Sequence, residues 1–119
     1  MGSSPSAAAT ETFGAWSAEY AMTIQYCGGW GYRASAVKVQ EEIDKMHPEK
    51  FQIVFNRDAR TTGNFEVVVR KKADPNDKGK MVHSKKGGQG YPHNDWTSFH
   101  ARLDAAMKWK QLLRWRDKI

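Results

Sequence analysis

MTIQYCGGWGY, residues 22–32, is the stretch of sequence that decides the fold. Its first half alternates apolar and polar side chains, as a strand does, and it ends at Cys27, the only cysteine of the chain. Glycines then turn the backbone, and a helical pattern opens at Tyr32. A cysteine at a helix N-terminus meets unpaired N–H groups and the positive end of the helix dipole, which favour thiolate over thiol. The stretch therefore predicts a strand, a turn that carries a reactive thiol, and a helix.

The sequence on both sides completes an α/β domain. The strand that ends at Cys27 starts near Glu19. The elements expected after it are a helix over Tyr32 to His47, strands over Phe51–Phe55, Phe65–Arg70 and Lys80–Ser84, and a last helix from Asn94 or Asp95 to about Lys118. The order β-α-β-β-β-α predicts a two-layer sandwich whose mixed sheet has four strands and carries both long helices on one face.

Residues 1–18 differ in composition from residues 19–119, which we expect to form a single domain. The leading segment is rich in Ser, Ala and Thr and shows little periodicity, so it reads as an extension. Phe13 and Trp16 interrupt its polarity. Aromatic side chains in such a segment indicate that it packs either on its own domain or on a neighbouring protein.

Composition limits the classes of function. One cysteine excludes an internal disulfide and favours a reducing compartment, and the histidines lack the spacing of metal ligands, so we expect no metal and no bound cofactor. No apolar run is long enough to span a bilayer. The absence of a clear signal makes a cytoplasmic location the default, with an organellar complex as the alternative. The net charge of +6 permits attraction to nucleic acid, but no nucleic-acid motif accompanies it, so nucleic-acid binding is the weakest candidate.

The last helix is apolar on more than one face. Trp109, Leu112 and Trp115 project away from the stripe that contains Trp96 and Leu103. Such a face has to be covered. The cover is either the aromatic side chains of the leading segment, Phe13 and Trp16, or a protein partner, and the sequence leaves both alternatives open.

Blocks of sequence in register resemble the selenoprotein W group of the Rdx family. They are YCGGWGY (26–32), TGNFEV (62–67) and VHSKKG (82–87) followed by Gly90-Tyr91, and the likeness covers roughly Tyr20 to Met107. The resemblance implies a thioredoxin-like fold and a glutathione-linked thiol or selenol oxidoreductase. It also implies a Cys-x-x-selenocysteine motif that begins at Cys27, with Tyr26, Gly28 and Gly29 as its supporting residues. The selenocysteine position of the motif is occupied here by Trp30.

Two interpretations of Trp30 stay open. Selenocysteine is encoded by UGA, one base from the tryptophan codon, so the natural residue 30 can be a selenocysteine that forms a selenenylsulfide with Cys27 or a mixed species with glutathione. If the tryptophan is genuine, Cys27 has no resolving partner in its motif, and the indole is expected to crowd or cap the thiol. Cys27 can then still form a mixed disulfide with glutathione. This second interpretation favours a subunit that has the Rdx fold but no redox activity and that belongs to a larger complex, for which an organellar location is an alternative. A fold does not by itself carry a function.

Overall fold

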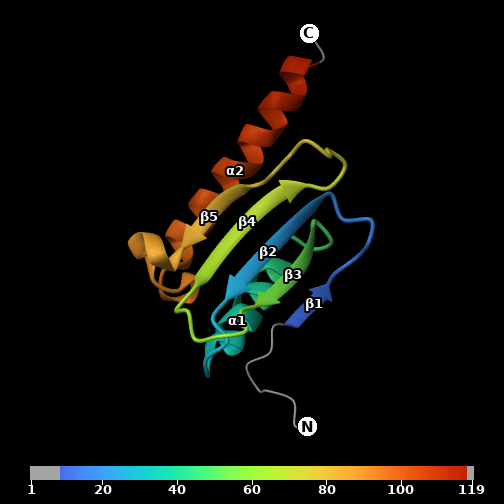
Figure 1. Cartoon of the computed structure of the whole chain (residues 1–119). Coiled ribbons are helices and arrows are strands. Elements are labelled where there is room, and N and C mark those ends of the chain that lie inside the picture. Colours follow the sequence, from blue (N-terminus) through green and yellow to red (C-terminus); the bar gives the residue numbers. More distant parts are fainter. Residues whose placement is uncertain (1–8, 118–119) are drawn as a thin grey trace.

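The structure is a computed structural model that describes the backbone of residues 9–117 and the side chains of residues 9–108. Within that range the sheet has five strands in the order β1-β3-β2-β4-β5 (Figure 1). The elements are β1 (Ala9–Phe13), β2 (Tyr20–Tyr26), α1 (Tyr32–Met46), β3 (Phe51–Arg57), β4 (Phe65–Lys71), β5 (Lys80–Ser84), the short helical turns η1 (Lys85–Gln89) and η2 (Pro92–Asn94), and α2 (Trp96–Asp117). β2 and β3 are parallel, and the other neighbouring strands are antiparallel.

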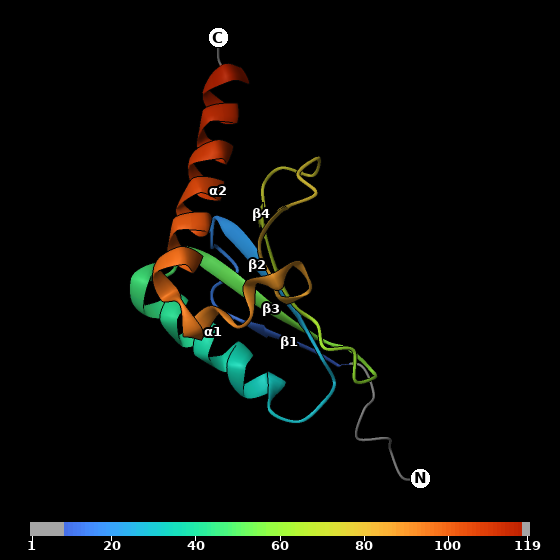
Figure 2. The same cartoon turned by 90° about the vertical axis from the view of Figure 1, so that its left-hand side faces the viewer.

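Both long helices cover the same face of the sheet, as predicted (Figure 2). α1 packs on β2 and β3, and α2 packs on β4 and β5. The core lies between the two layers: Ile24 and Phe55 of the central strands, Val39 of α1 and Leu103 of α2 are all fully buried in it. The alternation seen in the sequence therefore assigns the core face of β2 correctly, because side chains of a strand alternate between the two faces of its sheet.

The prediction of four strands is wrong, because the leading segment adds a fifth. β1 pairs antiparallel with β3, from Ala9 opposite Arg57 to Phe13 opposite Ile53. The ring of Phe13 lies 4.7 Å from that of Phe55, centroid to centroid, so this aromatic side chain packs on its own domain. β1 is an exposed edge strand of mostly polar residues, and its sequence lacks the apolar alternation by which a half-buried strand is found.

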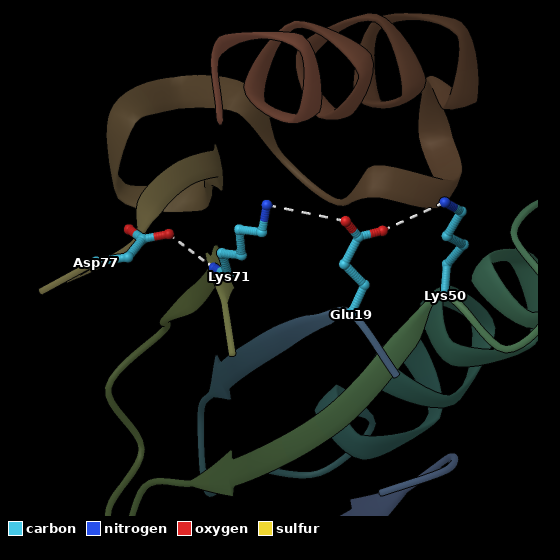
Figure 3. Close-up of polar contacts among 4 residues, drawn as sticks. All are labelled: Glu19, Lys50, Lys71 and Asp77. Atoms are coloured by element: carbon cyan, nitrogen blue, oxygen red, sulfur yellow. Dashed lines mark hydrogen bonds and ion pairs between the residues drawn. The ribbon is translucent and has the colours of Figure 1, made fainter. Parts of the chain in front are cut away.

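Ion pairs connect the strands at the end of the sheet where β2 begins (Figure 3). The carboxylate of Glu19 lies 3.4 Å from the ammonium of Lys50 and 3.9 Å from that of Lys71. Asp77 accepts a hydrogen bond of 2.7 Å from the main-chain N–H of Lys71, which ties the turn between β4 and β5 to the sheet. Lys50 is exposed and Glu19 is partly exposed, and an ion pair at the surface contributes about 0–1 kcal/mol, so these contacts orient this end of the sheet more than they stabilise it.

Of the two predicted N-cap residues of α2, Asn94 and Asp95, it is Asp95 that caps the helix. Asp95 accepts a 3.1 Å hydrogen bond from the N–H of Ser98, whereas Asn94 belongs to the preceding turn η2. The C-terminal half of α2 extends past the sheet (Figure 1). The side chains of Trp109, Leu112 and Trp115 lie outside the described residues, so the predicted second apolar face stays a prediction. Among residues 9–117, no helix is long and apolar enough to cross a membrane.

Candidate functional site

Cys27 directly follows β2, and the connection between β3 and β4 holds its main chain in place. Its N–H donates to the carbonyl of Asn64 over 2.9 Å, and the N–H of Gly28 donates to the carbonyl of Arg60 over 2.9 Å. A Cβ atom at Gly28 would lie 2.3 Å from the carbonyl oxygen of Asp58, closer than real Cβ contacts come, so this close approach of two main chains requires glycine. The turn after Cys27 and the loop from residue 58 to residue 64 are therefore one unit.

Hydrogen-bond donors surround the sulfur of Cys27. Burial raises the pKa of the thiol, but hydrogen bonds from the main-chain N–H groups of Gly63, Gly29 and Thr62 and from the Thr62 hydroxyl outweigh burial, so the pKa lies below its usual value. The bond from the Gly29 N–H measures 3.2 Å. A thiol whose pKa is lowered in this way has more of the reactive thiolate at neutral pH.

The source of this stabilisation differs from the prediction. The sequence places the thiol at a helix N-terminus, but α1 starts only at Tyr32, after Gly31, whose φ of 89° is a left-handed conformation. The donors come instead from the adjacent Gly29 and from the loop residues Thr62 and Gly63. The sequence contained a signal for this loop, since Thr62 and Gly63 open one of the blocks that carry the family resemblance.

Trp30 does not cover the thiol. Its side chain is 100% exposed, whereas Cys27 is 0% exposed. An indole that capped the sulfur would bury part of its own surface, so the expectation that Trp30 crowds or caps Cys27 is wrong. The side chain of residue 30 instead projects from the turn into solvent, where its size is unconstrained by the core.

Two tyrosines and a lysine form a cluster, and one of them, Tyr91, is near enough to Cys27 for the charge of the thiolate to act on it. The rings of Tyr32, at the start of α1, and Tyr91, after η1, have centroids 5.7 Å apart, and the ammonium of Lys85 lies 5.8 Å and 5.6 Å from them. A hydrogen bond with Tyr32, together with burial and the charges of Tyr32 and Cys27, raises the pKa of Tyr91 to about 12. Tyr91 therefore stays neutral at physiological pH, and the charge within this cluster is that of the lysine.

Glu66 and His83 hold the basic loop, Lys85–Gly90, that provides this lysine. The carboxylate of Glu66 accepts hydrogen bonds from the Ser84 hydroxyl and, over 2.8 Å, from the N–H of Lys85. Nε2 of His83 lies 2.7 Å from the carbonyl oxygen of Gly90, at the end of the loop. The loop is thus fixed at both ends. Because Glu66 lies on β4 and His83 on β5, these two strands determine where Lys85 lies.

The other residues singled out in the sequence take different places. Tyr26 is buried, and its ring meets that of Phe55 edge-on at 5.8 Å, so it supports the motif from the core. Phe13 is partly buried and packs against the core. Trp16 is 86% exposed, and the ammonium of Lys72 lies 5.7 Å from the centre of its ring. In the part of the chain that the structure describes, no group of His, Cys, Asp and Glu side chains is arranged to hold a metal ion.

Comparison with known proteins points to the same family as the sequence blocks. A model of the Rdx family matches residues 21–98. Selenoprotein W of Sus scrofa is 35% identical over 88 residues, which cover 74% of this chain and 90% of that protein. Selenoprotein W of Ovis aries is 35% identical over 87 residues (73% and 88%), and that of Danio rerio is 36% identical over 72 residues (60% and 74%). The matched region contains the Cys27 turn, the loop from residue 58 to residue 64 and the basic loop, and on these grounds the chain belongs to the selenoprotein W/Rdx family.

Proposed function

We propose that the chain is a thiol or selenol oxidoreductase that exchanges disulfides with glutathione at Cys27. Membership of the Rdx family indicates a redox-related function. The observation that carries the finer proposal is the set of donors around the sulfur, which lowers the pKa of Cys27. A purely structural cysteine in an apolar core would have a raised pKa.

The basic loop supports glutathione as the exchange partner. The ammonium of Lys85 lies over the tyrosines next to the thiol, and the charge of Lys86 acts on the neighbouring Asp58. Glutathione and its disulfide carry net negative charge, so these lysines favour their approach. Tyr32 and Tyr91 offer flat apolar surfaces with hydroxyl groups, and the charge of Cys27 acts on Tyr91.

The proposed step is a thiol–disulfide exchange. The thiolate of Cys27 attacks one sulfur of glutathione disulfide, so that a new S–S bond forms to Cys27 while the old one breaks. The leaving glutathione thiolate takes a proton from water. Attack by a second glutathione thiolate reverses the step, and a selenocysteine at residue 30 would release glutathione by forming a selenenylsulfide with Cys27.

The buried sulfur has to become accessible for this reaction. Cys27 is fully buried, and the turn that follows it has glycine at positions 28, 29 and 31. Glycine lowers the barrier to backbone rearrangement because it adopts a wide range of φ and ψ. We infer that the turn moves to admit the disulfide, and the fully exposed side chain of residue 30 moves with it without disturbing the core.

The test compares folded and unfolded protein. Each is incubated with glutathione disulfide at the same pH, and the mixed disulfide is followed by intact-protein mass spectrometry, with Cys27→Ser as the control for adducts elsewhere. The proposal expects the folded thiol to react at least as fast as the unfolded one. A folded protein that resists modification while the unfolded chain reacts would make Cys27 a structural thiol.

A second candidate function, that of a redox-inactive interaction subunit, is favoured by the exposure of Trp30. A fully exposed tryptophan on a turn is typical of a contact surface. Mass spectrometry of residues 27–33 from protein of the natural source separates the two candidates. Selenium at residue 30 supports the oxidoreductase, and an indole there, with a partner that co-purifies and is lost in Trp30→Ala, supports the subunit.

A further inference from the structure

Asp58, which directly follows β3, is the centre of a hydrogen-bond network next to Cys27. Its carboxylate accepts from the side chains of Gln25 (2.9 Å), Thr62 (2.6 Å) and Asn64 (2.8 Å). Burial raises the pKa of Asp58, but these hydrogen bonds and the charge of Lys86 outweigh it, so the pKa lies below its usual value. Asp58 is therefore a carboxylate at neutral pH.

Asn64 shows how strongly the network is organised around this carboxylate. The amide nitrogen of Asn64 donates to Asp58, and its amide oxygen is buried with no hydrogen-bond partner among the described residues. Turning the amide over would place that oxygen against the carboxylate. The carboxylate thus fixes the orientation of the amide, although this orientation leaves a buried acceptor unpaired.

The Thr62 hydroxyl stands between two acceptors. It donates to a carboxylate oxygen of Asp58 over 2.6 Å, and it is also within reach of the sulfur of Cys27, because hydrogen bonding by this hydroxyl lowers the pKa of the thiol. A hydroxyl has one proton, so it donates to only one of them at a time. The N–H of Asn64 donates to the Thr62 hydroxyl oxygen over 3.2 Å, so when the hydroxyl donates to Asp58 only one lone pair is left for the sulfur, and a lone pair favours the protonated thiol over the thiolate.

We propose that Asp58 restrains the reactivity of Cys27 by competing with the thiolate for the hydroxyl proton of Thr62. When the thiol ionises, its proton goes to water, and the Thr62 O–H bond stays intact but rotates from the carboxylate to the sulfur. Asp58 keeps its bonds from Gln25 and Asn64. Asp58 is thus a positioning residue that acts through Thr62, and its role rests on the proposed thiol exchange.

Other charged groups near the sulfur do not reproduce this effect. Tyr32 of α1 and the neutral Tyr91 lie on the side of the loop Lys85–Gly90. Arg57 of β3, which donates to the Gly28 carbonyl oxygen over 3.3 Å, and Lys86, which acts on Asp58, carry the opposite sign of charge. The negative charge of Asp58 itself opposes thiolate formation in the same direction as the competition for the proton. The experiment therefore has to separate the charge of Asp58 from its hydrogen bond to Thr62.

The test titrates the thiolate directly by its ultraviolet absorbance and by the rate of alkylation with iodoacetamide, neither of which requires glutathione. In Asp58→Asn we expect the pKa of Cys27 to fall by about one unit and alkylation below that pKa to accelerate by up to about tenfold. Asp74→Asn, in the turn between β4 and β5, removes the same charge at the other end of the sheet and is expected to leave both values unchanged (Figure 1).

Variants of Thr62 separate the two mechanisms. Thr62→Val removes the hydroxyl and is expected to raise the pKa of Cys27, while Thr62→Ser restores it. In the Thr62→Val background, Asp58→Asn should lose most of its effect. An equal effect in both backgrounds would show that only charge acts, and a Cys27 pKa that is unchanged or raised in Asp58→Asn would overturn the proposal. If Asp58→Asn does not fold, Thr62→Ser against Thr62→Val still decides whether the hydroxyl controls the thiol.

The readouts also keep this proposal distinct from the proposed function. Thiolate absorbance and alkylation report on the sulfur alone, so they give a result whether or not glutathione exchanges at Cys27. Failure of glutathione exchange with a normal response to Asp58→Asn would refute the glutathione chemistry and leave the control of the thiol by Asp58 intact.

Discussion

The main-chain N–H of Gly29 donates to the sulfur of Cys27 over 3.2 Å, two residues along the same turn. A Cβ atom at Gly29 would lie 3.2 Å from that sulfur and 3.4 Å from the Thr61 methyl group. Glycine at this position therefore has two roles: it brings a donor to the thiolate, and it leaves room for the sulfur.

Gly29→Ala is expected to weaken this arrangement. The new methyl group pushes the sulfur away from its donors, so the pKa of Cys27 should rise toward its usual value, and the crowding should lower the free energy of unfolding by about 1–3 kcal/mol. Thiolate titration and urea unfolding measure the two effects. Gly31→Ala is the matched control: its Cβ meets no atom within 4 Å, but its φ of 89° strains an alanine, so it should reduce stability and leave the thiol pKa unchanged.

Lys85→Glu is expected to slow the reaction with glutathione disulfide several-fold at low salt, because it reverses the charge that lies over Tyr32 and Tyr91. The same variant should react with a neutral disulfide, such as hydroxyethyl disulfide, at a rate changed only by the altered thiol pKa. Lys78→Glu, in the turn at the far end of the sheet, is the control. Equal slowing with both disulfides would argue against an electrostatic site for glutathione.

Trp30→Cys is expected to convert the turn into a dithiol motif at no cost to the fold. The side chain of residue 30 is fully exposed, so the free energy of unfolding should change by no more than about 0.5 kcal/mol. The glutathione adduct on Cys27 should then be released by an internal disulfide, visible as the loss of the adduct in intact-protein mass spectra. In Trp30→Ser the adduct should persist. Persistence of the adduct in Trp30→Cys as well would show that residue 30 does not reach Cys27.

The elements around Cys27 can be predicted from the sequence because each of them buries one face, which leaves a periodic pattern of apolar residues. The alternation from Tyr20 to Tyr26 and the helical spacing of Ala36, Val39 and Ile43 are strong local signals, and the structure buries these residues. β1 was missed because an edge strand exposes most of its side chains. Local periodicity reports on burial, and Ala9–Phe13 is only partly buried.

The surroundings of the thiol were harder to predict for a different reason. Thr62 and Gly63 reach Cys27 only because β2 and β4 are neighbours in the sheet, a contact between segments more than thirty residues apart. Lys85 reaches the same site through β5 and its loop. Spacing along the chain does not show such contacts, and the order of the blocks that resemble the family is what indicates that these segments belong together.

His83 makes the stability of the fold depend on pH. Its ring is 1% exposed; Nε2 lies 2.7 Å from the Gly90 carbonyl oxygen, and Nδ1 lies 2.8 Å from the guanidinium of Arg102. A carbonyl only accepts and a guanidinium only donates, so the ring is neutral, with its proton on Nε2. Burial lowers the pKa of His83, and the charge of Arg102 lowers it further, against the opposing effects of Gly90 and Glu66.

The sign of the pH effect follows from that direction. Because the pKa of His83 is lower in the folded state, the unfolded chain binds the proton more readily, and the stability present above the unfolded pKa of about 6.5 is lost as the pH falls toward the folded value. We expect urea unfolding to show a lower free energy of unfolding at about pH 5 than at about pH 7.5. In His83→Gln the protein should be less stable at the higher pH, since the bonds to Gly90 and Arg102 change, but the difference between the two pH values should shrink. A difference as large as in the parent chain would assign the pH dependence to the other histidines with lowered pKa values, His47 and His93.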